Sequence, residues 1–147
     1  MGTRGDCQAI VNSVREDIKK VISKSLLQSD FSNALNQVNR DAAFREVEEV
    51  FPESISWVLS SYSSFSLPVF GDTTQTSETG FCQGDPLTLL LFSLVLHPVV
   101  KAIQELVPNL KVNAWSPDNG TQVGTREELQ QVVNILDREG PARGLHP

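Results

Sequence analysis

Apolar positions recur along the chain in two spacings, and each spacing predicts one kind of element. Steps of three and four residues are typical of amphipathic helices, and they cover five segments: 6–24, 40–50, 52–62, 85–106 and 126–140. Short apolar or alternating runs beside turn residues are typical of strands, and they cover residues 25–31, 65–70, 73–79, 110–115 and 121–124. Strands mixed with helices without strict alternation favour an α+β fold, with an antiparallel sheet covered by helices on one face.

Residues at three expected helix starts support these boundaries. Asn39 and Asp85 have side chains that can accept hydrogen bonds from the free amides in the first turn of a helix. Pro86 suits the first helical position. Thr125 and Glu128 have the spacing of a capping box. No repeat or linker interrupts the pattern, so we expect one domain over residues 1–147.

The most apolar run, "LTLLLFSLVL" at 87–96, predicts a fully buried helix, because it is shorter than a membrane span of about 20 residues. The N-terminal sequence has no signal-peptide pattern, and Cys7 and Cys82 lack the spacing of a metal site. These features predict an intracellular protein, cytoplasmic or nuclear, that does not enter a membrane.

The formal net charge of −6 opposes strong independent binding to nucleic acid, because such binding needs a basic face. The one dense group of cations comprises Lys19, Lys20 and Lys24, a pattern more common on an ordinary solvated surface. His146 is expected in an unstructured tail.

The segment "WSPDNGTQVG" at 115–124 predicts a hairpin whose tip includes Asp118, Asn119 and Gly120. By itself, Asp118 is better explained as a turn former than as a metal ligand. Asp30, at the end of the expected strand 25–31, is likewise an ordinary turn or cap residue when it is considered alone.

Three segments in order resemble the palm of reverse transcriptases, in particular those of cellular and non-LTR-retrotransposon type. They are "SDFSNALNQVNR" at 29–40, "GFCQGDPLTLLLFSLVLHPVV" at 80–100 and "AWSPDNGTQVG" at 114–124. The similarity extends over nearly all of the chain, and the Q-G-D-P-L block with its leucine-rich helix is the most specific part. The resemblance implies a reverse-transcriptase-like palm with partial fingers and no thumb.

The resemblance also implies a site for two Mg²⁺ ions, which would stabilise the attacking and leaving oxygens of nucleotidyl transfer. Asp30 and Asp118 match the carboxylate ligands, and the backbone carbonyl of Phe31 matches a third metal ligand. Hard oxygen ligands of this kind suit Mg²⁺. These positions predict that Asp30 and Asp118 meet above one sheet.

The nucleotide and template would be contacted by the residues that match the family's binding positions, which are Phe31, Leu35, Gln83 and Gly84. Leu35 stands where the family usually has an aromatic ring that excludes the 2′-hydroxyl. Template-primer and deoxynucleotides are therefore the implied partners, although the acidic charge weakens that expectation for this chain.

Departures from the family pattern argue against activity. Asn119 stands at the second acidic position of the catalytic hairpin, so the metal cluster would lose one negative charge. Ser116 replaces an aromatic residue beside the primer, and Trp115 is expected to fill part of that space. Pro117 fixes φ near −65° at a tip where a positive φ is expected, which would displace Asp118.

Three hypotheses follow from these features. The first is a reverse transcriptase domain, RNA-directed DNA polymerase by descent, that is inactive as this fragment. The second is a non-catalytic interaction or structural domain that reuses the palm. The third is a polymerase subunit completed in trans. A palm without its fingers and thumb should also expose an apolar patch that could meet a protein partner and that lowers solubility.

Overall fold

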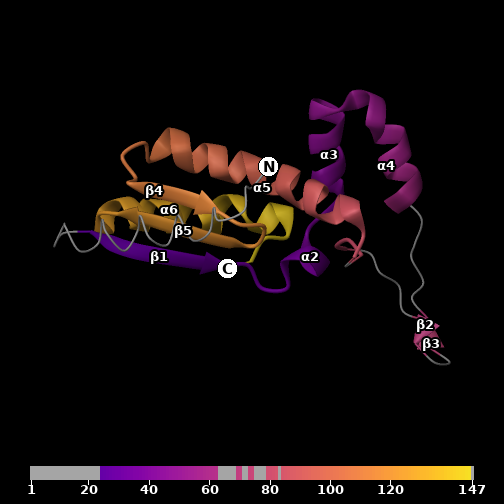
Figure 1. Ribbon diagram of the computed structural model, residues 1–147, viewed down its shortest axis with the longest axis horizontal. Coiled ribbons are helices and arrows are strands. Elements are labelled where there is room, and N and C mark those ends of the chain that lie inside the picture. The colour runs from indigo at the N-terminus through magenta and orange to yellow at the C-terminus, as the bar shows by residue number, and fades with distance from the viewer. Residues whose placement is uncertain (1–23, 63–68, 71–72, 75–78, 83, 147) are drawn as a thin grey trace.

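The computed structural model describes residues 24–62, 69–70, 73–74, 79–82 and 84–146 (Figure 1). The helix predicted over 6–24 therefore lies outside the described residues except for Lys24, which leads into the first strand. The described elements, in chain order, are β1 (Ser25–Asp30), α2 (Ala34–Gln37), α3 (Arg40–Val50), the 3-10 helix η1 (Pro52–Ser54), α4 (Ile55–Tyr62), β2 (Val69–Phe70), β3 (Thr73–Thr74), α5 (Pro86–Leu106), β4 (Val112–Trp115), β5 (Asn119–Gly124), α6 (Arg126–Glu139) and the 3-10 helix η2 (Pro141–Arg143).

Three antiparallel strands form the main sheet in the order β1-β5-β4, so that β5 lies in the centre. α6 packs against β1 and β5, and α5 packs against α6 and α3 (Figure 1). The predicted α+β class with an antiparallel sheet is confirmed. The predicted hairpin near residue 71 is present as the short pair β2–β3, in the register Val69↔Thr74, and the outer parts of its two predicted strands lie outside the described residues.

The three predicted helix starts are confirmed in detail. The Asn39 side chain accepts hydrogen bonds from the two amides that open α3, at 2.9 and 3.2 Å. Asp85 accepts from the Leu87 amide at 2.9 Å, and Pro86 is the first residue of α5. Thr125 and Glu128 form both bonds of the capping box, at 2.7 and 3.3 Å. Local sequence chemistry therefore fixes where these helices begin.

The prediction that the leucine-rich helix is fully buried is wrong. Leu91 and Phe92 are buried in the core, whereas Leu89 is 52% exposed and Leu90 is 47% exposed. A continuous apolar run wraps around all sides of a helix, but only the stripe facing α3 and α6 finds partners. The helix is also longer than the run: among the described residues, only α5 reaches, by length and composition, the size of a membrane span, with a mean hydropathy of 1.8 and 39% of that window buried.

The C-terminal segment is not the unstructured tail that was expected. The carbonyl of His146 accepts a hydrogen bond from the Ser32 amide at 2.8 Å, and the carbonyl of Arg143 accepts one from the Asn39 amide at 2.9 Å. Leu145 is fully buried. The end of the chain therefore packs against the segment that follows β1, far away in the sequence.

The end of α4 is tied to the start of α5 by Tyr62. Its hydroxyl donates a hydrogen bond to the Asp85 carboxylate, and its ring meets Phe81 edge to face, with centroids 5.0 Å apart. Burial, reinforced by the bond to Asp85, raises the pKa of Tyr62 to about 12. The bond from Tyr62, helped by the Leu87 amide, lowers the pKa of Asp85.

This pairing predicts a loss of stability at high pH. The folded pKa of Tyr62 exceeds the unfolded value of about 10, so its contribution is complete below pH 10 and disappears as pH rises to about 12. Tyr62 is the only tyrosine, so its ionisation can be followed directly by ultraviolet absorbance. We expect Tyr62→Phe to lower the melting temperature by about 2–4 °C at neutral pH and to remove this alkaline step. An unchanged step in the variant would contradict the assignment.

Candidate functional site

The two candidate aspartates lie near each other where β1 ends beside the β4–β5 hairpin. Asp30 is opposite Asn119 in the strand register, and the Phe31 amide donates to the Asp118 carbonyl at 3.1 Å. Asp30, Phe31, Leu35 and Asp118 line one cavity of about 290 Å³. The structure thus brings four of the predicted site residues to one place, with Asn119 next to them. Their roles toward metal and nucleotide stay predictions.

The hairpin tip is narrower than the sequence pattern suggested. Ser116 and Asn119 exchange backbone hydrogen bonds of 2.9 and 3.2 Å, so the loop consists of Pro117 and Asp118 alone. Asn119 and Gly120 belong to β5 and do not form the turn.

The expected conflict between Pro117 and a positive φ does not arise. Asn33 is the one described non-glycine residue with positive φ, and it lies outside this hairpin. A type I turn needs no positive φ and favours proline at its second position, which is where Pro117 lies. Asp118 therefore occupies a regular turn in line with the end of β1.

Hydrogen bonding at the tip limits what Asp118 can do. The side-chain amide of Asn119 donates to one Asp118 carboxylate oxygen at 2.9 Å. Asp118 is half-buried, whereas Asp30 is exposed. One oxygen of Asp118 is thus already engaged by Asn119, at the position where the resemblance would place a second acid.

A stacked aromatic pair packs next to Asp30 and Asp118. Phe31 is buried and stacks on Trp115, with ring centroids 6.0 Å apart and planes 12° apart. The Trp115 indole N–H donates to the Asn113 side chain at 2.8 Å. The Trp115 ring crosses β5 at Gly120, where an added Cβ would lie 2.7 Å from the ring and 2.5 Å from Ser29 Oγ. Trp115 therefore packs on Phe31, the residue that directly follows Asp30 at the end of β1.

Backbone hydrogen bonds, here called the clamp, join residues 35–38 of the first motif to Gly80 and Phe81, which precede α5. The Gly80 amide donates to the Val38 carbonyl at 2.9 Å, and the Phe81 amide donates to the Leu35 carbonyl at 2.8 Å. Arg40, which is 9% exposed, donates through Nε to the Gly80 carbonyl at 2.6 Å. No sequence pattern singled out Arg40 beforehand, although it closes the first motif.

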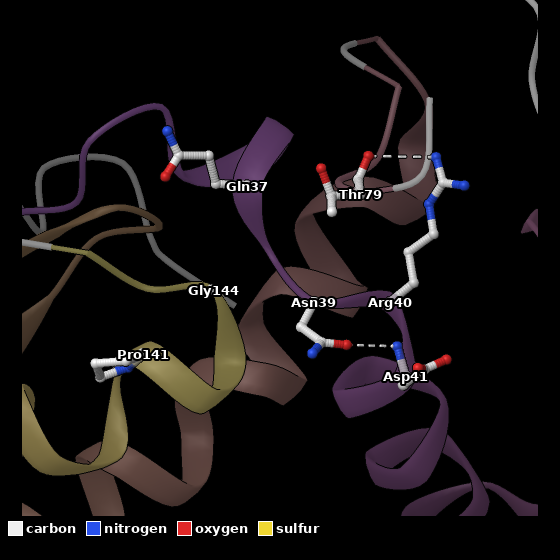
Figure 2. Close-up of a pocket in the computed structure, with 7 residues that line it drawn as sticks. All are labelled: Gln37, Asn39, Arg40, Asp41, Thr79, Pro141 and Gly144. Atoms are coloured by element: carbon white, nitrogen blue, oxygen red, sulfur yellow. Dashed lines mark hydrogen bonds between the residues drawn. The ribbon is translucent and has the colours of Figure 1, made fainter. Parts of the chain in front are cut away.

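Figure 2 shows a cavity beside this clamp, of about 320 Å³. The Arg40 guanidinium points to the Thr79 carbonyl, at 3.4 Å, and the Asn39 side chain points to the α3 amides. The lining residues are Gln37, Asn39, Arg40, Asp41, Thr79, Pro141 and Gly144. Arg40 bonds to Gly80 of the clamp and also lines this cavity. Neither Asp30 nor Asp118 lines it.

Two predicted nucleotide-contacting residues are not placed at the site. Gln83 lies outside the described residues. Gly84 is exposed, with φ +95° and no atom within 4 Å of an added Cβ, and it is not among the described residues that line the cavity of Asp30. The loop around these residues is nevertheless anchored to Leu35 through Phe81.

The donor set can be compared with what a metal ion needs. Two carboxylates, one from the end of β1 and one from the hairpin turn, supply the hard oxygen ligands that Mg²⁺ prefers. Within the described part of the chain, no group of three or more His, Cys, Asp or Glu side chains could hold a metal. The residues therefore fit one Mg²⁺ that completes its shell with water or phosphate oxygens, and they do not form a larger acidic cage.

The fold has a known counterpart. The chain is similar to the solved structure of apo telomerase from Candida tropicalis truncated from its C-terminal domain, with a TM-score of 0.73 and 12% sequence identity. The similarity covers 99% of this chain and 34% of the telomerase chain, so the chain spans about a third of that protein's length. No protein-family model and no curated protein sequence matches the chain. At this identity the comparison shows the fold alone, and it is compatible with a reverse-transcriptase-like arrangement.

The clamp predicts a strong requirement for glycine at position 80. Gly80 has φ +70°, and a Cβ there would lie 2.3–2.4 Å from the Asn36 backbone. We expect Gly80→Ala to lower the free energy of unfolding by about 2–4 kcal/mol, from backbone strain together with overpacking. Gly84→Ala is the matched control, because it has a positive φ in open space, and it should cost about 1 kcal/mol. Equal losses for the two variants in urea unfolding would contradict the clamp.

Proposed function

We propose that this chain is a palm-type domain of the reverse transcriptase class that has kept part of a metal and nucleotide site and lacks polymerase activity by itself. The observation that carries the proposal is that Asp30, at the end of β1, and Asp118, in the turn of the β4–β5 hairpin, line one cavity with Phe31 and Leu35. The motifs in the sequence and the similarity in fold to telomerase support the same class.

Asp30 and Asp118 would hold the metal, with the Phe31 carbonyl as a third ligand. A bound Mg²⁺ supplies charge stabilisation at phosphate oxygens. Leu35, on the cavity wall, would lie against the sugar, and the loop of Gln83 and Gly84 would face the base and template. A nucleotide phosphate is then the ligand class that the cleft accepts, and nucleic acid is the larger partner that the fold similarity suggests.

Two features support the absence of independent polymerase activity. Asn119 carries no charge and occupies one oxygen of Asp118, so two closely spaced Mg²⁺ ions would lack enough negative ligands. The net charge of −6 also repels a phosphate backbone. Basic partner chains that supply fingers and a thumb in trans would offset the net charge of −6. They would not restore the missing charge at Asn119.

Metal binding provides the direct test, with Trp115 as the reporter because it stacks on Phe31. The chain has two tryptophans, and Trp57→Phe removes the other signal. In that background, we expect saturable fluorescence quenching by Mn²⁺ and competition by Mg²⁺ at millimolar concentration. Asp30→Ala and Asp118→Ala should each abolish the response. Asn119→Asp should strengthen binding by about tenfold, because it restores a charged ligand.

Asp41→Ala serves as the matched control, since Asp41 is an exposed aspartate that does not line the Asp30 cavity. It should leave the Mn²⁺ titration unchanged. If the parent protein shows no response at millimolar metal, or if Asp41→Ala weakens the response as much as Asp30→Ala does, the surviving site is rejected and the non-catalytic domain becomes the better account.

A second candidate function is a non-catalytic interaction domain, and the exposed apolar side chains favour it. Trp57 is 58% exposed on α4, Phe51 is 40% exposed after α3, and Leu89 is 52% exposed on α5. Tyr62 joins the end of α4 to the start of α5 through Asp85, so these elements adjoin one another. Large apolar side chains left in water at adjoining helices are typical of a surface that another protein covers.

Surface substitution tests this second candidate. We expect Trp57→Gln and Leu89→Gln to raise the solubility limit several-fold while the melting temperature changes by only a few degrees. Leu91→Gln is the matched control, because Leu91 is 1% exposed on the same helix and its loss should destabilise the fold. Unchanged solubility in the two surface variants would remove the support for an apolar docking surface.

A further inference from the structure

The outer edge of β1 carries backbone groups that no described residue pairs with. Hydrogen-bonding pairs alternate along antiparallel strands, and the Phe31 amide bonds to the Asp118 carbonyl. Odd-numbered residues of β1 therefore face β5, and Leu26, Gln28 and Asp30 turn their amides and carbonyls outward. β1 is an edge strand in the order β1-β5-β4, so these groups form a template for another strand.

Among the described residues, no strand pairs with this edge, and a groove lies along it. A cavity of about 310 Å³ lies between β1 and α6, and its apolar wall includes Leu27, Val133 and Leu136. Ser29 lines the same cavity, is 9% exposed, and has a hydroxyl with no hydrogen-bond partner among the described residues.

The sequence of this edge is complementary to itself. Residues 24–30 read "KSLLQSD", with serines two positions on either side of Leu27 and opposite charges three positions on either side. When it is paired antiparallel with a second copy about Leu27, Lys24 faces Asp30 and Ser25 faces Ser29. The outward-facing residues 26 and 28 face each other and can exchange backbone bonds, as the ladder requires.

We propose that two copies of this chain associate through β1, in antiparallel register centred on Leu27, to form a continuous six-stranded sheet. The contact is isologous, since each surface meets its own copy. Ser29 then lies opposite Ser25 of the second copy, in the closely spaced type of cross-strand pair. The second copy's Leu27 enters the groove beside Val133 and Leu136.

Charge complementarity favours a second copy over an unrelated strand. Each end of the paired segment sets a Lys24 ammonium beside an Asp30 carboxylate, so one dimer gains two cross-strand ion pairs. Such pairs also fix the register, because a shift by two residues would separate the charges. They offset part of the repulsion between two chains that each carry a net charge of −6.

The inference is independent of the proposed function. Asp30 borders both the metal cavity and the edge groove, so the association is best measured in the presence of a metal chelator. The readout is molecular mass, and with the chelator present it reports the association without competition from metal for Asp30. A chain without metal affinity can still dimerise, and a monomer can still bind metal.

Charge reversal and mixing test the dimer by sedimentation equilibrium of the full chain. Lys24→Glu alone and Asp30→Lys alone each set like charges opposite one another at both ends, and each should weaken association by about tenfold or more. When the two variants are mixed, the acidic positions of one chain face the basic positions of the other, and association should return as a heterodimer. The double variant Lys24→Glu/Asp30→Lys should also dimerise.

Lys101→Glu and Glu48→Lys are the matched controls, because both change the same charges at exposed positions outside β1. They should leave association unchanged. Amide exchange should slow with protein concentration at Leu26, Gln28 and Asp30, while the amides of Leu27 and Ser29, which already bond to β5, do not respond.

Two results would overturn the proposal. One is a parent chain that stays monomeric at ~100 µM, well above the micromolar dissociation constant typical of a small interface. The other is a dimer whose strength does not depend on positions 24 and 30, which would place the contact on the exposed helices or on an edge occupied by another kind of strand.

Discussion

The antiparallel pairing of β1 with β5 is the constraint on which the site and the proposed interface both depend. It sets Asp30 opposite Asn119 and brings the Phe31 amide to the Asp118 carbonyl. It also decides which backbone groups of β1 are used inside the sheet and which face outward. A shift of one residue would move Phe31 away from Trp115 and turn Asp30 toward the helices.

The rest of the site is held by backbone contacts more than by ion pairs. The clamp between residues 35–38 and 80–81 works because Gly80 accepts a positive φ and lets two backbone segments touch. A similar close approach occurs at Gly144, where a Cβ would meet the Gln37 carbonyl at 2.1 Å. Small residues at these contacts allow the first motif, the loop before α5 and the C-terminal segment to pack as one layer.

Both proposals use the Asp30 carboxylate, so metal binding and association through β1 would compete for it. Asp30 lines the cavity shared with Asp118 and also the groove between β1 and α6. A metal ion on one side and a lysine on the other would share one exposed carboxylate. Asn119 already donates to one oxygen of Asp118, which leaves Asp30 as the carboxylate on which both proposals depend.

Sequence alone determined what depends on neighbouring residues. The caps at Asn39, Asp85 and Thr125 and the periodic helices were predictable, because a side chain and the amides two or three positions ahead decide them. The three ordered motifs also indicated that Asp30 and Asp118 would meet. Only the tertiary structure decided which side of α5 is covered, since a continuous apolar run has no preferred face.

Tertiary structure likewise decided the hairpin tip and the end of the chain. Asn119 and Gly120 carry the strongest local turn signal, yet pairing with β1 draws them into β5 and leaves the turn to Pro117 and Asp118. His146 looks like part of a tail until its carbonyl meets the Ser32 amide. In each case the deciding contact joins residues far apart in the sequence, where local propensity carries no information.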